Sequence, residues 1–296
     1  MTLTVRPIDP VGRHFFAGEV SGVDLTRPLS QENVTAVHAG MDQYGVLVFH
    51  DQPVDDEQQL AFCRSLGRLE PADGDIVAPE NRRVRSEFND ISNLDHNNEV
   101  LAREDRRRLF RLGNELWHSD SSFKPVPALY SILSARRIPV SGGNTEFADM
   151  RAAYDALEEA NKSEIHDLIC LHSQIFSRAI LGFTDFTDQE RAKWAPVRQR
   201  LVRRHPSTGR LSIYLSAHAG AIEGFPVPEA RALLRDLMEH GTQRKFVYSH
   251  VWRANDLVMW DNRTTMHRAR RFDGTQVRDL RRLTLTNAVS SLEQAP

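Results

Sequence analysis

The sequence predicts a mainly β fold, with an all-β core, helical insertions and an outer layer of helices. Five short apolar runs bounded by turn residues are typical of strands, and longer amphipathic segments between them are typical of helices. No repeat, low-complexity tract or long linker divides the 296 residues. Because barrels and sandwiches of this length often form one domain, we expect a single domain spanning residues 1–296.

The five predicted strands are short and rich in apolar side chains. The run GVLVFH at residues 45–50 is apolar nearly throughout, which indicates a buried strand. The other four runs lie at residues 128–133, 211–215, 256–260 and 282–286.

Three segments between these runs carry helix signals. Residues 55–66 begin with an acidic turn, as a helix N-terminus favours, and continue with an apolar stripe. Residues 152–160 are rich in helix formers. Residues 228–240 have Pro228 near the expected start, a leucine-rich stripe, and Gly241 just after the expected end.

The charge balance argues against highly charged partners. A net charge of -2 offers no basic field for nucleic acid and no polybasic patch for a membrane surface. No run of apolar residues is long enough to span a membrane, and the start MTLTVRPIDP lacks the pattern of a signal peptide. We therefore expect a cytoplasmic protein with neither a nucleic-acid nor a membrane partner.

The chain contains only two cysteines, Cys63 and Cys170, each among apolar residues. We expect two buried thiols, with a disulfide as the alternative. Two cysteines are too few for a zinc–cysteine cluster.

One pair of residues suggests a metal site. In LWHSDSSF, an extended backbone would direct His118 and Asp120 to the same side. An imidazole and a carboxylate, completed by a remote histidine, form the facial triad of non-haem Fe(II) enzymes. The pair alone is weak evidence, since a chain with 12 histidines contains about one such pair by chance. The alternative is a loop histidine beside an aspartate that caps a helix.

The C-terminal region supports the metal site. His267 follows the predicted strand DLVMW and a turn, and Arg278 and Arg282 come shortly after it. Because they are four residues apart, the two arginines share one face of a strand and can bind two different carboxylates. Thr145 follows a Gly-Gly turn, and its hydroxyl can donate to a carboxylate that an arginine holds. A basic surface strand and an ordinary turn are the alternatives.

These segments resemble the taurine / 2,4-dichlorophenoxyacetate dioxygenase family of Fe(II)/2-oxoglutarate-dependent enzymes. The motifs that carry the resemblance are LWHSDSSF, SGGNTEFADMRAAYDAL and DLVMWDNRTTMHRARR followed by RDLRRLT. It extends over essentially the whole chain, through LVFHDQPVDDEQQLAFCRSLGRLE and ALLRDLMEHGTQRKFVYSHVW. Within the family, the segments NELWHSDSSF and HRARRFD most resemble the sequences of the bacterial enzymes that degrade phenoxyacetate herbicides.

The resemblance implies a double-stranded β-helix, or jelly roll, and a set of site residues. The iron ligands would be His118, Asp120 and His267, and Thr145 and Arg278 would hold the far carboxylate of 2-oxoglutarate. Arg282 would anchor an anionic substrate. Three further residues are candidates for lining the substrate pocket: His205, His218 and Asn114. A packed or surface position is the alternative for each of the two histidines.

The resemblance also implies a reaction. With Fe(II), 2-oxoglutarate and O2, the enzyme would hydroxylate the ether-linked carbon of a small anionic aromatic substrate such as 2,4-dichlorophenoxyacetate. The products would be a phenol, glyoxylate, succinate and CO2. Members of the family tend to form homo-oligomers.

One departure concerns the substrate carboxylate. Some phenoxyacetate enzymes use N-terminal lysines there, but this chain has no lysine before Lys124. Either Arg282 acts with neutral donors, or an arginine such as Arg82 or Arg83 assists it.

Three other functions remain open from the sequence. The same chemistry could act on an alkylsulfonate, an alkyl sulfate or a chiral 2-aryloxypropionate. A zinc hydrolase also uses two histidines and one carboxylate, although the sequence has no HExxH motif. A jelly-roll protein that binds an aromatic acid without catalysis is the third.

Overall fold

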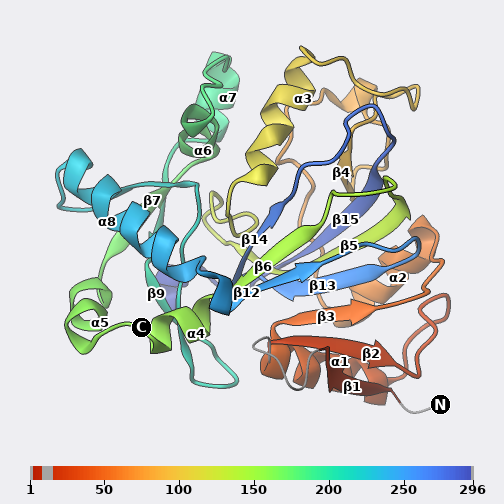
Figure 1. Cartoon of the computed structure of the whole chain (residues 1–296), viewed down its shortest axis with the longest axis horizontal. Coiled ribbons are helices and arrows are strands. Elements are labelled where there is room, and N and C mark those ends of the chain that lie inside the picture. Colours follow the sequence, from red (N-terminus) through yellow and green to blue (C-terminus); the bar gives the residue numbers. More distant parts are fainter. Residues whose placement is uncertain (1–2, 9–15, 295–296) are drawn as a thin grey trace.

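The computed structural model describes residues 3–8 and 16–294, in which strands and helices are mixed (Figure 1). Among these residues, the strands form four sheets, with helices beside them. Within the described residues, no helix is long and apolar enough to cross a membrane.

The largest sheet has seven strands in the order β1-β2-β3-β13-β5-β15-β4. Neighbouring strands are antiparallel except for the parallel pair β2 and β3. The strands are β1 Thr4–Pro7, β2 Ala17–Ser21, β3 Val46–Phe49, β13 Leu257–Asp261, β5 Ala128–Arg137, β15 Asp279–Thr286 and β4 Asn89–Ser92.

The central strands β3 and β13 are buried on both faces, which explains why they are apolar. In β3, Leu47 faces one core cluster together with the helices α1 (Gln31–Tyr44) and α2 (Asp56–Leu66), and Val48 faces another. Met259 and Trp260 of β13 are divided in the same way. Because alternate side chains of a strand point to opposite faces, a strand buried on both sides is apolar at every position.

A second antiparallel sheet stacks on the inner face of the first. Its order is β12-β6-β14, with β12 Val247–His250, β6 Thr145–Asp149 and β14 Thr265–Ala269. Phe147 of β6 packs against Trp260 of β13 with ring centroids 5.4 Å apart. The far face of this sheet contributes Ala148 and Met266 to a third core cluster beneath α4 and α8.

Two smaller sheets extend the structure beside β6 and β14. They pair β11 Ala219–Ile222, β7 Ile169–His172 and β8 Val197–Arg200 in one sheet, and β10 Leu211–Ile213 and β9 Val202–Arg204 in the other. The helix α8 Val227–Gly241 lies alongside them (Figure 1).

Two of the three helices expected from the sequence are present. Asp55 caps α2 through a capping box with Gln58, and α8 begins one residue before the expected start. The single helix expected over residues 152–160 is wrong, because the chain turns at Leu157, which is buried in the core, and forms two helices. The helices are α1 Gln31–Tyr44, α2 Asp56–Leu66, α3 Arg106–Arg111, α4 Met150–Asp155, α5 Glu159–Ile165, α6 Gln174–Ile180, α7 Asp188–Lys193 and α8.

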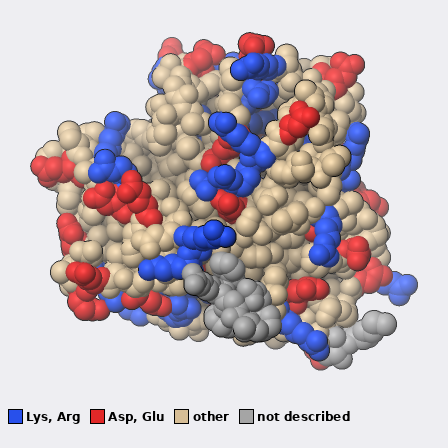
Figure 2. All heavy atoms as spheres, viewed as in Figure 1, with Lys and Arg blue, Asp and Glu red and all other residues tan. Residues whose placement is uncertain are grey.

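Short 3-10 turns complete the fold: η1 Pro79–Asn81, η2 Leu112–Glu115, η3 Arg244–Phe246 and η4 Ser291–Glu293. The helix α3 and the α6–α7 region meet in a small aromatic cluster of Phe110, Phe186 and Trp194. Cys63 and Cys170 are buried free thiols, as expected. On the face drawn in Figure 2, acidic and basic side chains are interspersed, and basic ones form a band running from α3 toward β14.

Candidate metal centre

His118 and His267 come together through their backbones. The N–H of each residue donates to the carbonyl of the other, at 3.0 Å from His118 and 2.8 Å from His267. This bridge attaches the segment before Asp120 to the edge of β14. Both imidazoles are buried, and their ring centroids lie 4.1 Å apart.

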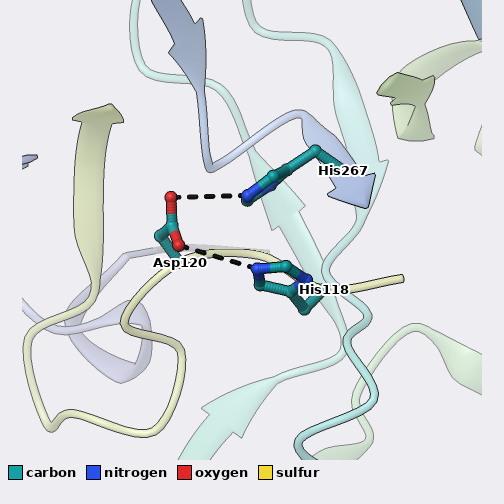
Figure 3. Close-up of side chains that lie close together, drawn as sticks. All are labelled: His118, Asp120 and His267. Carbon is teal, nitrogen blue, oxygen red and sulfur yellow. Dashed lines mark ion pairs between the residues drawn. The ribbon is translucent and has the colours of Figure 1, made fainter. Parts of the chain in front are cut away.

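Asp120 completes the cluster from the start of a tight turn. Its backbone N–H donates to Asn262 Oδ1, and Ser121 after it has a φ of 54°. The Asp120 carboxylate oxygens lie 3.8 Å from His118 Nε2 and 3.6 Å from His267 Nε2 (Figure 3). One ligand atom from each residue lies within 4.8 Å of the others.

The two histidines offer unprotonated nitrogens to this cluster. Burial lowers the pKa of His118, although Asp120 counteracts it in part. Burial and the neighbouring His118 hold the pKa of His267 well below its usual value. His118 Nδ1 is 2.7 Å from the Leu116 carbonyl, so it carries the proton and leaves a lone pair on Nε2.

The Asp120 carboxylate is ionised and held at both oxygens. Arg282 donates to Oδ1 at 2.5 Å, and the Ser131 hydroxyl donates to Oδ2 at 2.7 Å. Burial opposes ionisation, but the charge of Arg282 and the Ser131 hydrogen bond favour it, and the pKa of Asp120 is lowered to about 2. Two neutral imidazoles and one carboxylate fit a divalent ion of the Fe(II) class and leave its remaining positions for other ligands.

A cavity beside the triad contains both residues expected at the 2-oxoglutarate site. His267, Thr145, Arg278 and Arg282 line it. Arg278 is buried and donates to the carbonyls of Ile91 and Gly143, at 3.3 Å each. Gly143 has a φ of 68°, and an added Cβ would lie 3.3 Å from Arg278 Nε, so the Gly-Gly turn leaves room for the guanidinium.

The orientation of the Thr145 hydroxyl is fixed by a tryptophan. Trp252 Nε1 lies 3.0 Å from Thr145 Oγ1. Because an indole N–H can only donate, Thr145 accepts this bond and keeps its own proton for another group. Thr145 and Arg278 therefore offer donors to the same cavity.

A second, larger cavity lies on another side of the triad. It shares four lining residues with the first: Ile91, Asn114, His118 and Arg282. His218 lines only the larger cavity, where its ring packs edge-on against His118 and Phe123. The triad thus lies between two cavities.

Comparison with known proteins identifies the family. Residues 4–284 match the family described as "Taurine catabolism dioxygenase TauD, TfdA family". The chain belongs to the TauD/TfdA family.

Several TauD/TfdA proteins are similar over nearly their full length. The alpha-ketoglutarate-dependent 2,4-dichlorophenoxyacetate dioxygenase of Cupriavidus pinatubonensis is 44% identical, covering 96% of this chain and 98% of that protein. The (S)-phenoxypropionate/alpha-ketoglutarate-dioxygenase of Delftia acidovorans is 35% identical, covering 91% of each chain. The crystal structure of AAD-2 in complex with Mn(II) and N-oxalylglycine superposes with a TM-score of 0.95 at 53% identity, covering 98% of this chain and 100% of AAD-2.

The structure corrects two expectations about the substrate side. His205 does not line either cavity, because its ring is buried against Asp261 and Arg263. Arg82 and Arg83 line a different cavity, and Arg83 is already paired with Asp90 and Asp279. The other two pocket candidates, Asn114 and His218, line the larger cavity beside the triad.

Two site residues were missed from the sequence. Trp252 lies in the segment FVYSHVW, but a tryptophan has no ligand-like spacing to mark it. Arg178 lies in the larger cavity, and its only signal is an arginine within the apolar run of SRAIL. Both reach the site through contacts between elements far apart in the chain.

Proposed function

We propose that this TauD/TfdA protein is an Fe(II)/2-oxoglutarate-dependent dioxygenase that hydroxylates the ether-linked carbon of an aryloxyalkanoate such as 2,4-dichlorophenoxyacetate. One observation carries the proposal: the buried triad of His118, Asp120 and His267 borders a cavity that also holds Arg278 and Thr145. The relatives that act on 2,4-dichlorophenoxyacetate and (S)-phenoxypropionate support the substrate class.

We propose that residues 1–296 form a single domain with a jelly-roll core. The stacking of β12-β6-β14 on the seven-stranded sheet supports this. His267 of β14 and Arg278, the residue before β15, line the same cavity. The two stacked sheets would thus provide a rigid support for the site.

His118, Asp120 and His267 would hold Fe(II). With 2-oxoglutarate and O2 bound, this ion supplies the oxidising chemistry of the reaction. The protein contributes position and the exclusion of water: all three ligands are at most 5% exposed, and Arg282 and Ser131 fix the orientation of the Asp120 carboxylate.

The smaller cavity would take 2-oxoglutarate. Arg278 has no carboxylate partner among the described residues, and its two hydrogen bonds go to neutral carbonyls. The far carboxylate of the cosubstrate would supply the missing charge, and Thr145 would donate the second hydrogen bond. Nothing in a zinc hydrolase calls for this pair of residues.

The larger cavity would take the organic acid. Arg282, His218 and Asn114 line it, and Asn114 and Arg282 also reach the cosubstrate cavity. Hydroxylation of the carbon between the ether oxygen and the carboxylate gives a hemiacetal, which breaks into a phenol and glyoxylate. Succinate and CO2 are the products of 2-oxoglutarate.

The test is to remove the ligands one at a time. His118→Ala, Asp120→Ala and His267→Ala should each abolish Fe(II)-dependent succinate formation, because a facial triad has no spare ligand. Succinate and phenol are measured with 2,4-dichlorophenoxyacetate, Fe(II), ascorbate and O2. His96→Ala, an exposed histidine away from the triad, is the matched control. Retained activity in any of the three variants would contradict the assignment.

A chiral 2-aryloxypropionate is the second candidate substrate, supported by the 35% identical (S)-phenoxypropionate enzyme. Parallel assays with both 2-phenoxypropionate enantiomers, taurine and an alkyl sulfate separate these substrates. O2-dependent consumption of 2-oxoglutarate would exclude a zinc hydrolase and a non-catalytic binding protein. The cytoplasmic location and the homo-oligomer stay predictions.

A further inference from the structure

The larger cavity contains a buried charge that the proposed function has not used. Arg178 belongs to α6, is only 5% exposed and lines this cavity together with His118 and Asp120. Burial lowers the pKa of Arg178 to about 10, so the guanidinium stays charged at neutral pH. A buried charge is costly unless it is paired.

The guanidinium rests in a site shaped for it. The Phe110 ring lies under the group, with its centroid 4.4 Å from Cζ. A Cβ at Gly113 would lie 2.6 to 2.8 Å from Cζ, Nε and Nη1 of Arg178, so the guanidinium packs face-on against the glycine backbone. The α3–η2 segment therefore leaves a flat space at Gly113 that this arginine fills.

Among the described residues, Arg178 has no carboxylate within ion-pair distance. Its Nη1 donates to Ser177 Oγ at 3.0 Å, and its Nε is buried without a hydrogen-bond partner. The charge of Asp75 raises the pKa of Arg178, but Asp75 already pairs with Arg111 at 2.9 Å.

The other cations of this cavity are already matched. Lys124 lies 2.9 Å from Glu70, Arg111 is held by Asp75, and Arg282 is held by Asp120. Arg178 is thus the cation in the cavity whose charge is left unmatched within the described part of the chain. Arg278 has the same property in the smaller cavity, so each of the two cavities beside the triad holds one such arginine.

The groups that form hydrogen bonds next to Arg178 are neutral. The Ser177 hydroxyl donates to the Gln174 carbonyl at 2.8 Å, so it can only accept from Arg178 and from His218 Nδ1, which lies 2.9 Å away. His218 Nδ1 therefore carries a proton. None of these neighbours of Arg178 carries a negative charge. An anion that pairs with Arg178 would therefore have to enter from the cavity.

We propose that Arg178 binds the carboxylate of the organic substrate in the larger cavity, as the counterpart of Arg278 in the smaller one. The inference rests on the proposed function, and it changes the part given to Arg282. Because Arg282 is neutralised by Asp120, its contribution is to hold that ligand, and the net attraction for an organic acid comes from Arg178.

The first test is Arg178→Met, which keeps the length of the side chain and removes the charge. The KM for 2,4-dichlorophenoxyacetate should rise by at least about 30-fold, as when one partner of a buried, hydrogen-bonded charge pair is lost. The KM for 2-oxoglutarate should change much less than that for the organic acid, because Arg178 lines only the larger cavity.

The second test uses a neutral analogue. With Mn(II) and N-oxalylglycine bound, calorimetry gives the Kd of 2,4-dichlorophenoxyacetate and of 2-(2,4-dichlorophenoxy)ethanol, which lacks the carboxylate. The parent protein should prefer the acid, and Arg178→Met should lose this preference by raising the Kd of the acid alone. A residue that only supports the fold would weaken both ligands equally.

Two further variants control for folding. Gly113→Ala keeps the arginine but displaces its guanidinium, so it should also weaken the acid selectively. Arg191→Met is the matched control, because Arg191 is exposed over the Phe186 ring and lines neither cavity. If Arg178→Met does not fold, Gly113→Ala decides by the same two Kd values.

The outcomes separate the two proposals. If the parent turns over the acid and the Arg178 or Gly113 variants keep its preference over the alcohol, Arg178 is not the carboxylate partner and the proposed function stands. If the parent neither turns over nor binds aryloxyalkanoates, the proposed substrate class and this inference both fail. Selective loss of acid binding in both variants supports the inference.

Discussion

Asp120 is fixed before any ligand arrives. Each carboxylate oxygen has a separate donor, Arg282 or Ser131, and the backbone N–H is held by Asn262. Asn262 is itself fixed, since its Nδ2 donates to Ser131 and its Oδ1 also accepts from Trp260. This network holds the carboxylate in one orientation, so a metal ion meets a preorganised ligand.

The Ser131 hydroxyl is the part of this network that can be removed most cleanly. Ser131→Ala should weaken metal affinity by about 10- to 100-fold, the usual cost of losing a group that orients a metal ligand. The metal concentration for half-maximal activity measures it. Ser134→Ala is the matched control, because Ser134 is buried on the same strand and its hydroxyl has no hydrogen-bond partner among the described residues. Equal effects of the two variants would contradict the role of Ser131.

Trp252 should influence 2-oxoglutarate binding through Thr145. Trp252→Phe keeps an aromatic ring but removes the N–H that orients the Thr145 hydroxyl. Loss of one neutral hydrogen bond predicts a rise of about two- to tenfold in the KM for 2-oxoglutarate. Arg278→Ala should raise the same KM further, since it removes a charge. A change confined to the KM of the organic acid would refute this coupling.

Most of the residues that lie together at the metal centre and its two cavities could be predicted individually from the sequence. His118, Asp120, His267, Thr145 and Arg278 stand at spacings that indicate ligands once they are considered together. His205 was misplaced because a histidine in a pocket and a histidine in a buried ion cluster look the same in sequence. Arg178 was missed because an arginine in an apolar helix shows its purpose only when Gly113 lies against it.

Among the elements, the strands were predicted better than the helices. The expected run at residues 45–50 contains β3, and the run at 256–260 covers all of β13 but its last residue, because burial on both faces requires apolar residues. The helix α1 was not predicted, although Ser30 caps it and Gly45, with a φ of 76°, ends it. The break between α4 and α5 depends on the burial of Leu157, a tertiary contact that helix propensity does not describe.

The turn after β13, which leads into β14 and His267, depends on one ion cluster. Asp261 ends β13 and pairs with Arg263 at 2.6 Å and with His205 at 3.2 Å. Burial opposes ionisation of Asp261, but Arg263 and His205 outweigh it and lower its pKa well below the usual 3.8. The ionised carboxylate therefore stabilises the fold above about pH 4, and this contribution is lost as the pH falls further.

Replacing this carboxylate should change the acid stability. Asp261→Asn leaves Arg263 unpaired and should lower the free energy of unfolding at pH 7 by about 3 kcal/mol. It should also make the loss of stability below pH 4 shallower than in the parent. Urea unfolding at pH 7, 4 and 3 measures both effects. A variant that loses stability in acid as steeply as the parent would show that Asp261 is not responsible.

The molecule as a whole should be stabilised by its ligands. A metal ion and a 2-oxoglutarate analogue bind only the folded protein, so at 100 times the Kd each stabilises it by about 2.7 kcal/mol. Mn(II) with N-oxalylglycine should therefore raise the Tm of the parent and of His96→Ala. His118→Ala should show little shift, and a full shift in that variant would mean that the ligands bind elsewhere.

The mutual backbone bonds between His118 and His267 also have a consequence for synthesis of the chain. His118 emerges from the ribosome in the first half of translation, and His267 emerges close to the end of translation. Until β14 has been made and has paired with the segment around His118, the nascent chain has no complete set of ligands. If His118, Asp120 and His267 are the ligands as proposed, loading of the ion would follow folding, and a truncated product that ends before β14 would lack one of the three.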